Sequence, residues 1–346
     1  MRALVTGGAG FIGSHIVDLL LAEGHEVAVI DNLTSGSYRN IPAGVRFYRE
    51  DIESPQSEQV ILKERPEIVF HEAAQMSVKA STDDPAYDAR VNVLGLINVL
   101  NSCVAAGVRK VVFASSGATY GNPRYLPIDE DHPQSPASPY GITKMVAEHY
   151  LAYYALDHGL AFTALRYGNV YGPRQNSRGE AGVVAIFTRQ LLAGEIPTIH
   201  WDGQQVRDYV YVTDVARANL CAATTGDGRC YCIGTGVGTS VNQIYQTVCS
   251  VLNVDVPPKR TDRRPGDLRT AFFKTERAAS ELGWKPLVSL EVGLRQTVNY
   301  CRAMAAVPHR ELAAIAGSAQ YDEPENPLDR LRRIRNLFGE SKSPLE

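Results

Sequence analysis

Short apolar runs alternate with amphipathic stretches through the first 170 residues, and this alternation constrains the fold more than any other feature of the sequence. The runs are rich in β-branched residues, which is typical of strands buried on both faces. They predict strands at residues 3–6, 26–30, 45–49, 67–71, 110–115 and 161–167. The periodicity between them predicts helices at residues 11–23, 55–64, 85–106 and 140–158. Strands that alternate with helices form a parallel sheet with both faces covered, so the sequence predicts a doubly wound α/β fold.

The alternation loosens beyond residue 170, where loops rich in Gly, Pro, Arg and Asp separate shorter elements. This change predicts an α/β domain in residues 1–170, to which some later segments return, and a smaller lobe in residues 171–306. Residues 307–346 are expected to form a tail, and its basic amphipathic stretch "LDRLRRIRNLF" predicts a solvated helix or a frayed end.

Composition narrows the class of protein. The chain has 346 residues, 44% of them apolar, and a net charge of −3, which allows a large core and gives no reason to expect nucleic acid or an anionic membrane as partner. Glycines and polar residues interrupt the apolar N-terminal stretch, so neither a secretion signal nor a membrane span is predicted. The six cysteines lack the spacing of metal ligands, which favours buried thiols in a reducing cytoplasm and no metal site.

The first predicted strand runs directly into "GGAGFIG", in which Gly7, Gly10 and Gly13 follow one another at intervals of three. Glycines in this place allow a tight turn and let a pyrophosphate approach the N-terminus of the next helix, whose free N–H groups favour an anion. The second strand ends at Asp31, where a carboxylate accepts hydrogen bonds from ribose hydroxyls and repels a 2′-phosphate. The pattern therefore predicts a dinucleotide site for NAD rather than NADP.

A second pattern lies in "SPYGITK", where Ser138 and Pro139 are typical of a helix start. Tyr140 and Lys144 then lie about one turn apart on the same face of the helix. An ammonium group beside a phenol lowers the phenol's pKa from about 10 toward neutrality, and a tyrosine of that kind can exchange a proton with a sugar hydroxyl. Beside a dinucleotide site, the pair predicts redox chemistry at a carbinol carbon.

Nearly the whole chain, to about residue 300, resembles the extended short-chain dehydrogenase/reductase family, and within it the NAD-dependent UDP-sugar 4-epimerases. The segments that carry the resemblance are "TGGAGFIG", "DNLTSG", "HEAAQMSV", "ASSGATYG", "YGITK", "LRYGNVYGPRQ", "RDYVYVTDVARA", "YCIGTG" and "RRPGD". The resemblance implies hydride removal from C4 of the sugar to NAD. It assigns Ser116 to the sugar O4, Tyr140 to acid/base catalysis, and Lys144 to tuning Tyr140 and binding the nicotinamide ribose.

The glycine motif and the resemblance together predict the residues around the cofactor. These are Gly7, Gly10, Phe11, Ile12, Gly13, Asp31, Asn32, Ser35, Gly36, Asp51, Ile52, Ala73, Ala74, Gln75, Asn92, Ala114, Ser115, Tyr140, Lys144 and Tyr167. Within this set, Asp51 and Ile52 are expected at the adenine edge.

The resemblance also implies a substrate site for a UDP-sugar. Its residues are Ser77, Ser116, Gly117, Tyr140, Asn169, Arg178, Val183, Thr198, His200, Arg207, Tyr209, Arg264 and Asp267. Arg207, Tyr209, Arg264 and Asp267 match what we call the UDP clamp. Charge supports this assignment independently, because guanidinium groups bind phosphate bidentately.

The residues that follow Ser116 bear on the reaction. Related sugar-nucleotide dehydratases carry an Asp-Glu pair after the strand, and related decarboxylases carry a glutamate, whereas this chain has Gly117 and Ala118. Without an acid or base for elimination, a 4-keto sugar is expected to rotate and take the hydride back on its other face. The sequence therefore predicts inversion at C4 with retention of NAD.

The sugar itself stays open. Ala271 stands at a position where a bulky tyrosine excludes N-acetyl groups in the family, so UDP-N-acetylglucosamine is one alternative. Arg178 lies near where relatives acting on UDP-glucuronate place an arginine against the C6 carboxylate, which makes UDP-glucuronate another. A non-catalytic NAD-binding protein and a net dehydrogenase are further alternatives. By resemblance, a homodimer is expected through helices 85–106 and 140–158.

Overall fold

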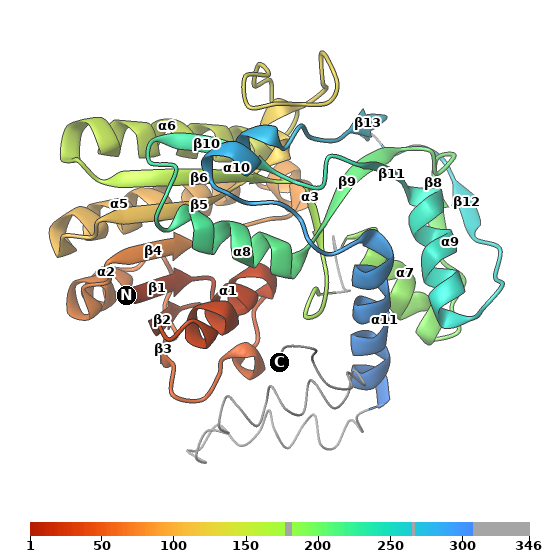
Figure 1. The fold of residues 1–346 in the computed structure, drawn as a ribbon, viewed down its shortest axis with the longest axis horizontal. Helices are drawn as coiled ribbons and strands as arrows, with labels where there is room; N and C mark the ends of the chain where they lie inside the picture. The colour runs from red at the N-terminus through yellow and green to blue at the C-terminus, as the bar shows by residue number, and fades with distance from the viewer. Residues whose placement is uncertain (177–181, 265–266, 307–346) are drawn as a thin grey trace, which may run out of the picture.

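A seven-stranded sheet organises the computed structural model, which describes residues 1–176, 182–264 and 267–306 (Figure 1). The strand order is β10-β6-β5-β4-β1-β2-β3, and every neighbouring pair is parallel. The strands are β1 Arg2–Thr6, β2 Glu26–Ile30, β3 Arg46–Tyr48, β4 Ile68–His71, β5 Lys110–Ser116, β6 Ala161–Tyr167 and β10 Arg229–Ile233. The order reverses beside β1, as in doubly wound folds, and the predicted fold class is confirmed.

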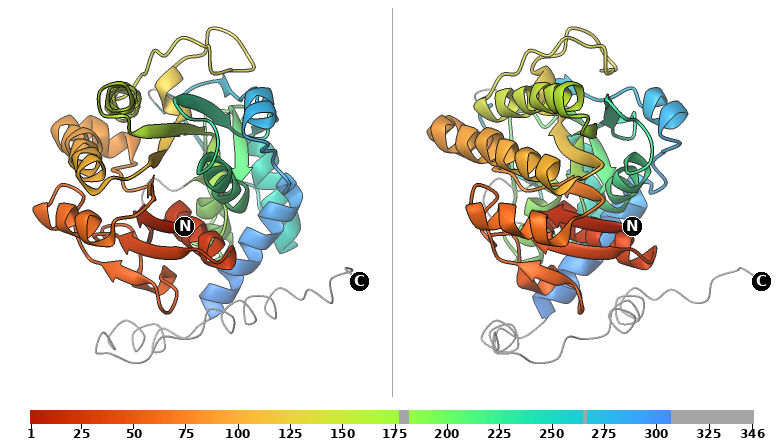
Figure 2. Two further views of the ribbon diagram at one scale, coloured as in Figure 1. Left: turned by 60° about the vertical axis from the view of Figure 1, so that its left-hand side comes forward. Right: turned by 90° about the vertical axis from the view of Figure 1, so that its left-hand side faces the viewer.

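Helices cover both faces of this sheet, as the two views of Figure 2 make visible. One face packs against α1 Phe11–Ala22, α8 Val212–Ala222 and α10 Glu276–Glu281. The other face packs against α2 Pro55–Glu64, α5 Gly95–Ala106 and α6 Pro139–His158. Each face therefore has its own buried core, which explains why the strands are apolar throughout rather than alternating.

The residues after β6 build a second group of elements, drawn in green and blue on the right of Figure 1. A four-stranded sheet contains β7 Asn169–Tyr171, β9 Val206–Tyr211, β11 Gly238–Ser240 and β13 Thr270–Ala271, and β8 Thr198–His200 pairs with β12 Lys259–Thr261. The helices α7 Val183–Leu192, α9 Val241–Leu252 and α11 Leu290–Ala306 share a third core with these strands.

The expected helix at residues 85–106 is a composite. It consists of α4 Pro85–Ala89, a π-helical turn at Arg90–Leu94 and then α5, and it follows a short helix α3 Val78–Asp83 that the sequence pattern did not indicate. Among the described residues, Pro85–Ala106 is the one helical stretch long and apolar enough to cross a membrane. Core helices pass the same test, and Val99, Leu100 and Cys103 of this stretch are fully buried against the sheet.

Candidate active site

The parallel strands bring most of the predicted cofactor residues to one edge of the sheet, because their carboxyl ends all point the same way. The turn after β1 is tight: Gly7 has a φ of +70°, and a Cβ on Gly13 would lie 2.3 Å from the Gly7 carbonyl oxygen. Helix α1 begins at Phe11 with no side chain capping its N-terminus. Bare backbone and uncapped N–H groups fit the pyrophosphate of a dinucleotide.

Asp31 follows β2 and faces the glycine turn. Its carboxylate accepts hydrogen bonds from the backbone N–H of Ala9, at 3.0 Å, and of Leu33, at 2.7 Å. Burial raises the pKa of Asp31, and these backbone bonds oppose the shift. Next to it, Asn32 donates to Asp51 at 3.1 Å. The structure thus joins three of the residues expected at the adenosine end of the cofactor.

The remaining residues of this end pack closely around the same two strands. A Cβ on Gly36 would lie 3.0 Å from an Asp31 oxygen, so the backbone passes directly over the carboxylate. Ile52 is buried, and its side chain leaves no room for a Cβ on Gly95. Ser35 lies beside Gly36 in the same half-exposed loop.

A polar network follows β4. The amide of Asn92 pairs with the backbone of Gln75 in both directions, at 2.8 and 2.9 Å. The fully buried Asp88 accepts from the side chains of Gln75, Asn92 and Thr143 at 2.7 to 3.0 Å. The backbone N–H of Ala73 bonds Thr6 at 3.3 Å, which fixes the Ala73–Ala74 segment against the end of β1. Thr143 belongs to α6, so the network ties the β4 loop to the helix that carries Tyr140 and Lys144.

Helix α6 begins as its sequence predicts. The Ser138 hydroxyl accepts from the Gly141 N–H at 3.2 Å, and Pro139 occupies the first turn. Tyr140 bonds the Ser116 hydroxyl at the end of β5, while Ser116 also accepts from the Ala118 N–H at 3.1 Å. The buried Lys144 ammonium donates to the Ala114 carbonyl at 2.7 Å and lies 4.7 Å from the Phe113 ring centroid. The structure therefore brings the three predicted catalytic side chains together.

The protonation of this group differs from the expectation. Burial raises the pKa of Tyr140 to about 12; the Ser116 bond opposes this, and the carboxylates of Asp88 and Glu72 add to it. Burial also lowers the pKa of Lys144 to about 8, against the attraction of Glu72 and Asp88. The prediction that Lys144 draws the tyrosine pKa toward neutrality is therefore wrong for this structure, because desolvation of the phenol raises its pKa and the Ser116 bond opposes the shift only in part.

Glu72 is a part of the site that the sequence analysis did not single out. It accepts from the Tyr167 hydroxyl at 2.8 Å, and Tyr167 in turn accepts from Asn219 of α8 at 2.7 Å. Burial raises the pKa of Glu72 to about 7, while Lys144 lowers it. Only its place directly after a buried strand, before Ala73, could have marked it in the sequence.

Ser115 makes a structural contact on the α6 side of the sheet. Its hydroxyl donates to Glu148 at 2.6 Å, and Glu148 forms a buried ion pair with Arg166 at 2.7 Å. The serine side chain is thus engaged behind the strand, and its neighbour Ala114 contributes a carbonyl to Lys144.

The floor of the predicted sugar site is formed by Gly117 and Phe273. Ser116 is followed by a 3₁₀ turn at Gly117–Tyr120, and a Cβ on Gly117 would lie 2.8 Å from the Phe273 ring. Phe273 is held by Asp208, whose buried carboxylate accepts from its N–H at 3.2 Å and from Thr235 and Gly236 at 2.7 to 3.0 Å. Asp208 is a second organising residue that sequence reasoning missed, although it lies inside "RDY".

The UDP clamp is divided between two sheets. Asn169 of β7 pairs with the buried Tyr209 of β9, and Arg207 of β9 pairs with Ala271 of β13. Burial lowers the pKa of Arg207, whose guanidinium donates to the Val206 carbonyl at 2.8 Å. Among the residues that the structure describes, Arg207 forms no salt bridge, although the Asp267 carboxylate attracts its charge from farther away.

The second half of the clamp surrounds β8 and β12. Arg264 donates to Nε2 of His200 at 2.6 Å, and this leaves Nδ1 of the neutral ring to donate to Thr261 at 2.7 Å. Burial and the Arg264 charge lower the pKa of His200. Asp267 donates its backbone N–H to the Arg264 carbonyl at 3.2 Å.

Three other predicted substrate residues lie on separate elements. Thr198 begins β8, Val183 begins α7, and Ser77 caps α3 by accepting from the Ala80 N–H at 2.9 Å. Arg178 lies outside the described residues, as does the tail from residue 307.

Comparisons with known proteins agree with this geometry. The model of the NAD dependent epimerase/dehydratase family matches residues 3–234. A UDP-glucose 4-epimerase of Mycolicibacterium smegmatis is 43% identical over 309 residues, covering 87% of this chain and 99% of that protein.

Two crystal structures are also similar to the chain. The UDP-glucose 4-epimerase of Thermotoga maritima with UDP-glucose superimposes with a TM-score of 0.87 at 47% identity, covering 88% of this chain and all of that one. The Thermus thermophilus UDP-glucose 4-epimerase in complex with NAD gives a TM-score of 0.84 at 45% identity, covering 89% and 100%. Given the family match and these likenesses, the chain belongs to the NAD-dependent epimerase/dehydratase family, as the resemblance predicted.

Proposed function

We propose that the protein catalyses the NAD-dependent epimerisation of a UDP-hexose at C4, interconverting UDP-glucose and UDP-galactose through a transient 4-keto sugar. The observation that carries this choice within the family is the contact of Gly117 with Phe273. A side chain at residue 117 would collide with the buried Phe273 ring, because even a Cβ would lie 2.8 Å from it. The site therefore has no space for an acidic group after Ser116, and elimination of water is disfavoured.

Tyr140 and Ser116 handle the proton of the sugar hydroxyl. Bound NAD supplies the hydride acceptor at this edge of the sheet. In its phenolate form, Tyr140 would take the O4 proton as the C4–H bond breaks and return it when the hydride comes back, with the Ser116 hydroxyl between Tyr140 and O4. Lys144, held on the Ala114 carbonyl, is assigned to binding the nicotinamide ribose.

The nucleotide end is held while the sugar turns. Arg207 provides a partly desolvated cation for the diphosphate, and Arg264 a second one from the β12 side. Gly117 and Ala118 bring no large or charged side chain to the proposed sugar end, which is compatible with a ring that presents either face. We assign Asn169, Tyr209 and Asp267 to the same end of the nucleotide. In this proposal the residues before about 170 form a cofactor domain and those after it form a substrate lobe.

The protein acts as a cytoplasmic homodimer in this proposal, with no nucleic acid or membrane partner. Helices α5 and α6 support the dimer, because large apolar side chains are exposed on this side of the molecule: Leu94 by 59%, Ile142 by 46%, Tyr153 by 51% and Leu156 by 89%. All six cysteines are free thiols, which fits a reducing compartment.

A second substrate is favoured by Ala271. Its small side chain packs against the buried cluster that contains Tyr120 and Phe273, and its size is compatible with an N-acetyl group on the sugar. The proposal of UDP-glucuronate rests on Arg178, outside the described residues.

A turnover panel tests the function. Purified protein with bound NAD is incubated separately with UDP-glucose, UDP-N-acetylglucosamine and UDP-glucuronate, and C4 inversion is followed by proton NMR. UDP-galactose formed from UDP-glucose without accumulation of NADH is the expected result. Steady NADH release identifies a dehydrogenase instead, and absence of inversion on all three sugars identifies a non-catalytic NAD-binding protein. Arg178→Ala is the control for the glucuronate arm, and unchanged glucuronate turnover in this variant removes the carboxylate argument.

A further inference from the structure

Trp201 occupies a backbone conformation that suits glycine better than tryptophan. It follows β8 with a φ of +60°, in the left-handed region that bulky residues rarely adopt. Its backbone N–H donates to the Thr261 carbonyl at 2.8 Å, which extends the pairing of β8 with β12 by one residue. A strained position of this kind is kept where the side chain contributes something that glycine cannot.

Two arginines stack on the Trp201 ring. The guanidinium carbons of Arg263 and Arg269 each lie 4.7 Å from the ring centroid. Arg269 is fixed at its far end, because one of its nitrogens donates to both carboxylate oxygens of Asp202 at 2.8 Å. Arg263 is fixed as well, by donating to the Asp267 carbonyl at 2.7 Å. The indole thus joins two cations that would otherwise repel each other.

These two arginines stand on either side of Arg264 and Asp267 in the sequence. Arg264 reaches back to His200, the residue before Trp201, at 2.6 Å. The backbone of Arg269 accepts from Val206 at 2.9 Å, next to Arg207. The Trp201 ring therefore links the backbone that carries Arg264 to the strand that carries Arg207, the two cations assigned to the diphosphate.

We propose that Trp201 is a positioning residue for a nucleoside diphosphate: by stacking with Arg263 and Arg269 it holds Arg264 beside His200, ready to exchange that neutral partner for a phosphate oxygen. This inference rests on the proposed function and adds to it a residue that does not touch the reacting atoms. It predicts an effect on nucleotide binding without an effect on the chemical step.

UDP is the probe, titrated into the NAD-loaded protein by calorimetry. Trp201→Gly removes the ring and suits the left-handed backbone, so we expect UDP to bind about tenfold more weakly with no fall in Tm. The KM for UDP-glucose is expected to rise by the same factor while kcat stays within about twofold. Trp201→Phe keeps an aromatic face and is expected to recover most of the affinity.

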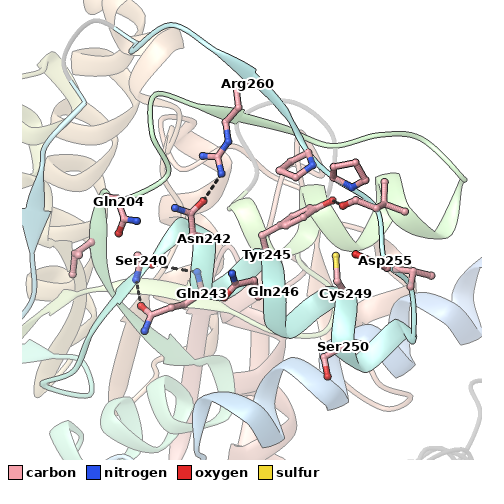
Figure 3. A pocket seen from close by; sticks show the side chains of 15 residues that line it. Gln204, Ser240, Asn242, Gln243, Tyr245, Gln246, Cys249, Ser250, Asp255 and Arg260 are labelled. Atoms are coloured by element: carbon pink, nitrogen blue, oxygen red, sulfur yellow. Dashed lines mark hydrogen bonds between the residues drawn. The ribbon is translucent and has the colours of Figure 1, made fainter.

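A matched pair of arginine variants separates stacking from net charge. Arg263→Ala removes a stacked cation and is expected to weaken UDP binding as Trp201→Gly does. Arg260→Ala removes an exposed cation of β12, the strand that precedes Arg263. Its guanidinium bonds Asn242 at 3.0 Å instead (Figure 3), and this variant is expected to leave UDP binding unchanged. Equal losses in both variants reduce the effect to electrostatics and overturn the proposal.

Fluorescence gives a readout independent of turnover. The second tryptophan, Trp284, is fully buried and donates to the Asp214 carbonyl at 2.8 Å, so it provides a constant background. UDP is expected to change the emission of the native protein and not that of Trp201→Phe. Native UDP affinity in Trp201→Gly overturns the positioning role and leaves the proposed function standing. Absence of UDP binding in the native protein overturns both.

Discussion

Burial and the nearby carboxylates of Asp88 and Glu72 raise the pKa of Tyr140 to about 12. We propose its hydroxyl, which bonds Ser116, as the acid/base group. We predict that Tyr140→Phe lowers kcat for UDP-glucose by a factor of about 10² to 10⁴ while NAD stays bound. The check is initial-rate kinetics together with the NAD content of the purified variant. Tyr153→Phe is the control, since this exposed hydroxyl on the same helix donates to Asp157 at 3.1 Å. A Tyr140→Phe variant with more than about a tenth of native activity contradicts the assignment.

Glu72 predicts a pH dependence of stability. Burial raises the pKa of this carboxyl from 4.5 to about 7, so between these values the folded state binds the proton more tightly than the unfolded state. Stability contributed by the protonated group is therefore present below about pH 4.5 and is lost as the pH rises through 7. Glu72→Gln removes this dependence, because the amide does not titrate. The difference in Tm between the variant and the native protein is therefore expected to rise from about pH 5 to pH 8.

The measurement is thermal unfolding of the NAD-free protein across that range. Glu58→Gln, exposed on α2, serves as the control and is expected to track the native protein. A difference between the Glu72 variant and the native protein that does not change with pH contradicts the prediction.

Spacing and position explain which residues could be found from the sequence. Helix spacing indicates Tyr140 and Lys144, and the family resemblance indicates Ser116 at a strand end, all without knowledge of packing. The protonation of Tyr140 and Lys144 could not be predicted from spacing. It depends on desolvation and on Asp88 and Glu72, which reach the site through tertiary contacts. Asp208 was missed for the same reason: its partners Thr235 and Phe273 are distant in sequence.

At the scale of elements, the β1–turn–α1 unit depends on the close approach of its own backbone. A Cβ on Gly13 would lie 2.3 Å from the Gly7 carbonyl oxygen, so any side chain there must displace the turn. We predict that Gly13→Ala lowers the NAD content of the purified protein by at least about tenfold.

Gly24→Ala is the matched control, because Gly24 has a φ of +75° with nothing within 4 Å of a Cβ. It is expected to cost about 1 kcal/mol of stability through backbone strain and to leave NAD bound. Absorbance and enzymatic assay of released NAD decide the outcome, and normal NAD content in Gly13→Ala would falsify the tight-turn argument.

Local signals located the elements of the first half well. The helix predicted at residues 55–64 is found as Pro55–Glu64, with Ser54 capping it and proline at its start. The sequence pattern did not predict the bounds of the elements after residue 170. Strands of two or three residues, such as β13, depend on pairing, in this case with β9. The return of β10 to the large sheet likewise depends on its pairing with β6, which no local feature of "RCYCI" indicates.

Large apolar side chains are exposed on one helical side of the described residues. Helix α6 exposes Ile142, Tyr153 and Leu156, and the π-helical turn before α5 exposes Leu94. Exposed apolar residues that gather on adjacent elements mark a surface for association, and a second copy of the chain presents the same surface by two-fold symmetry. Tyr140 lies at the start of α6, so the proposed dimer contacts on this helix and the proposed active site share one element.

We predict that a charge in this surface separates the dimer. Leu156 is 89% exposed near the end of α6, and Leu156→Glu places a carboxylate where burial would be costly, so the variant is expected to be a monomer at concentrations where the native protein is a dimer. Size-exclusion chromatography with light scattering measures the mass directly. Leu287→Glu is the control, because Leu287 is 73% exposed but precedes α11 in the other lobe, and this variant is expected to remain dimeric. A monomeric native protein contradicts the proposed dimer. A dimer that persists in Leu156→Glu but is lost in Leu287→Glu contradicts an interface on α5 and α6. If the dimer does separate, the rate of epimerisation by the monomer then reports how far the position of Tyr140 depends on the packing of α6 against its partner.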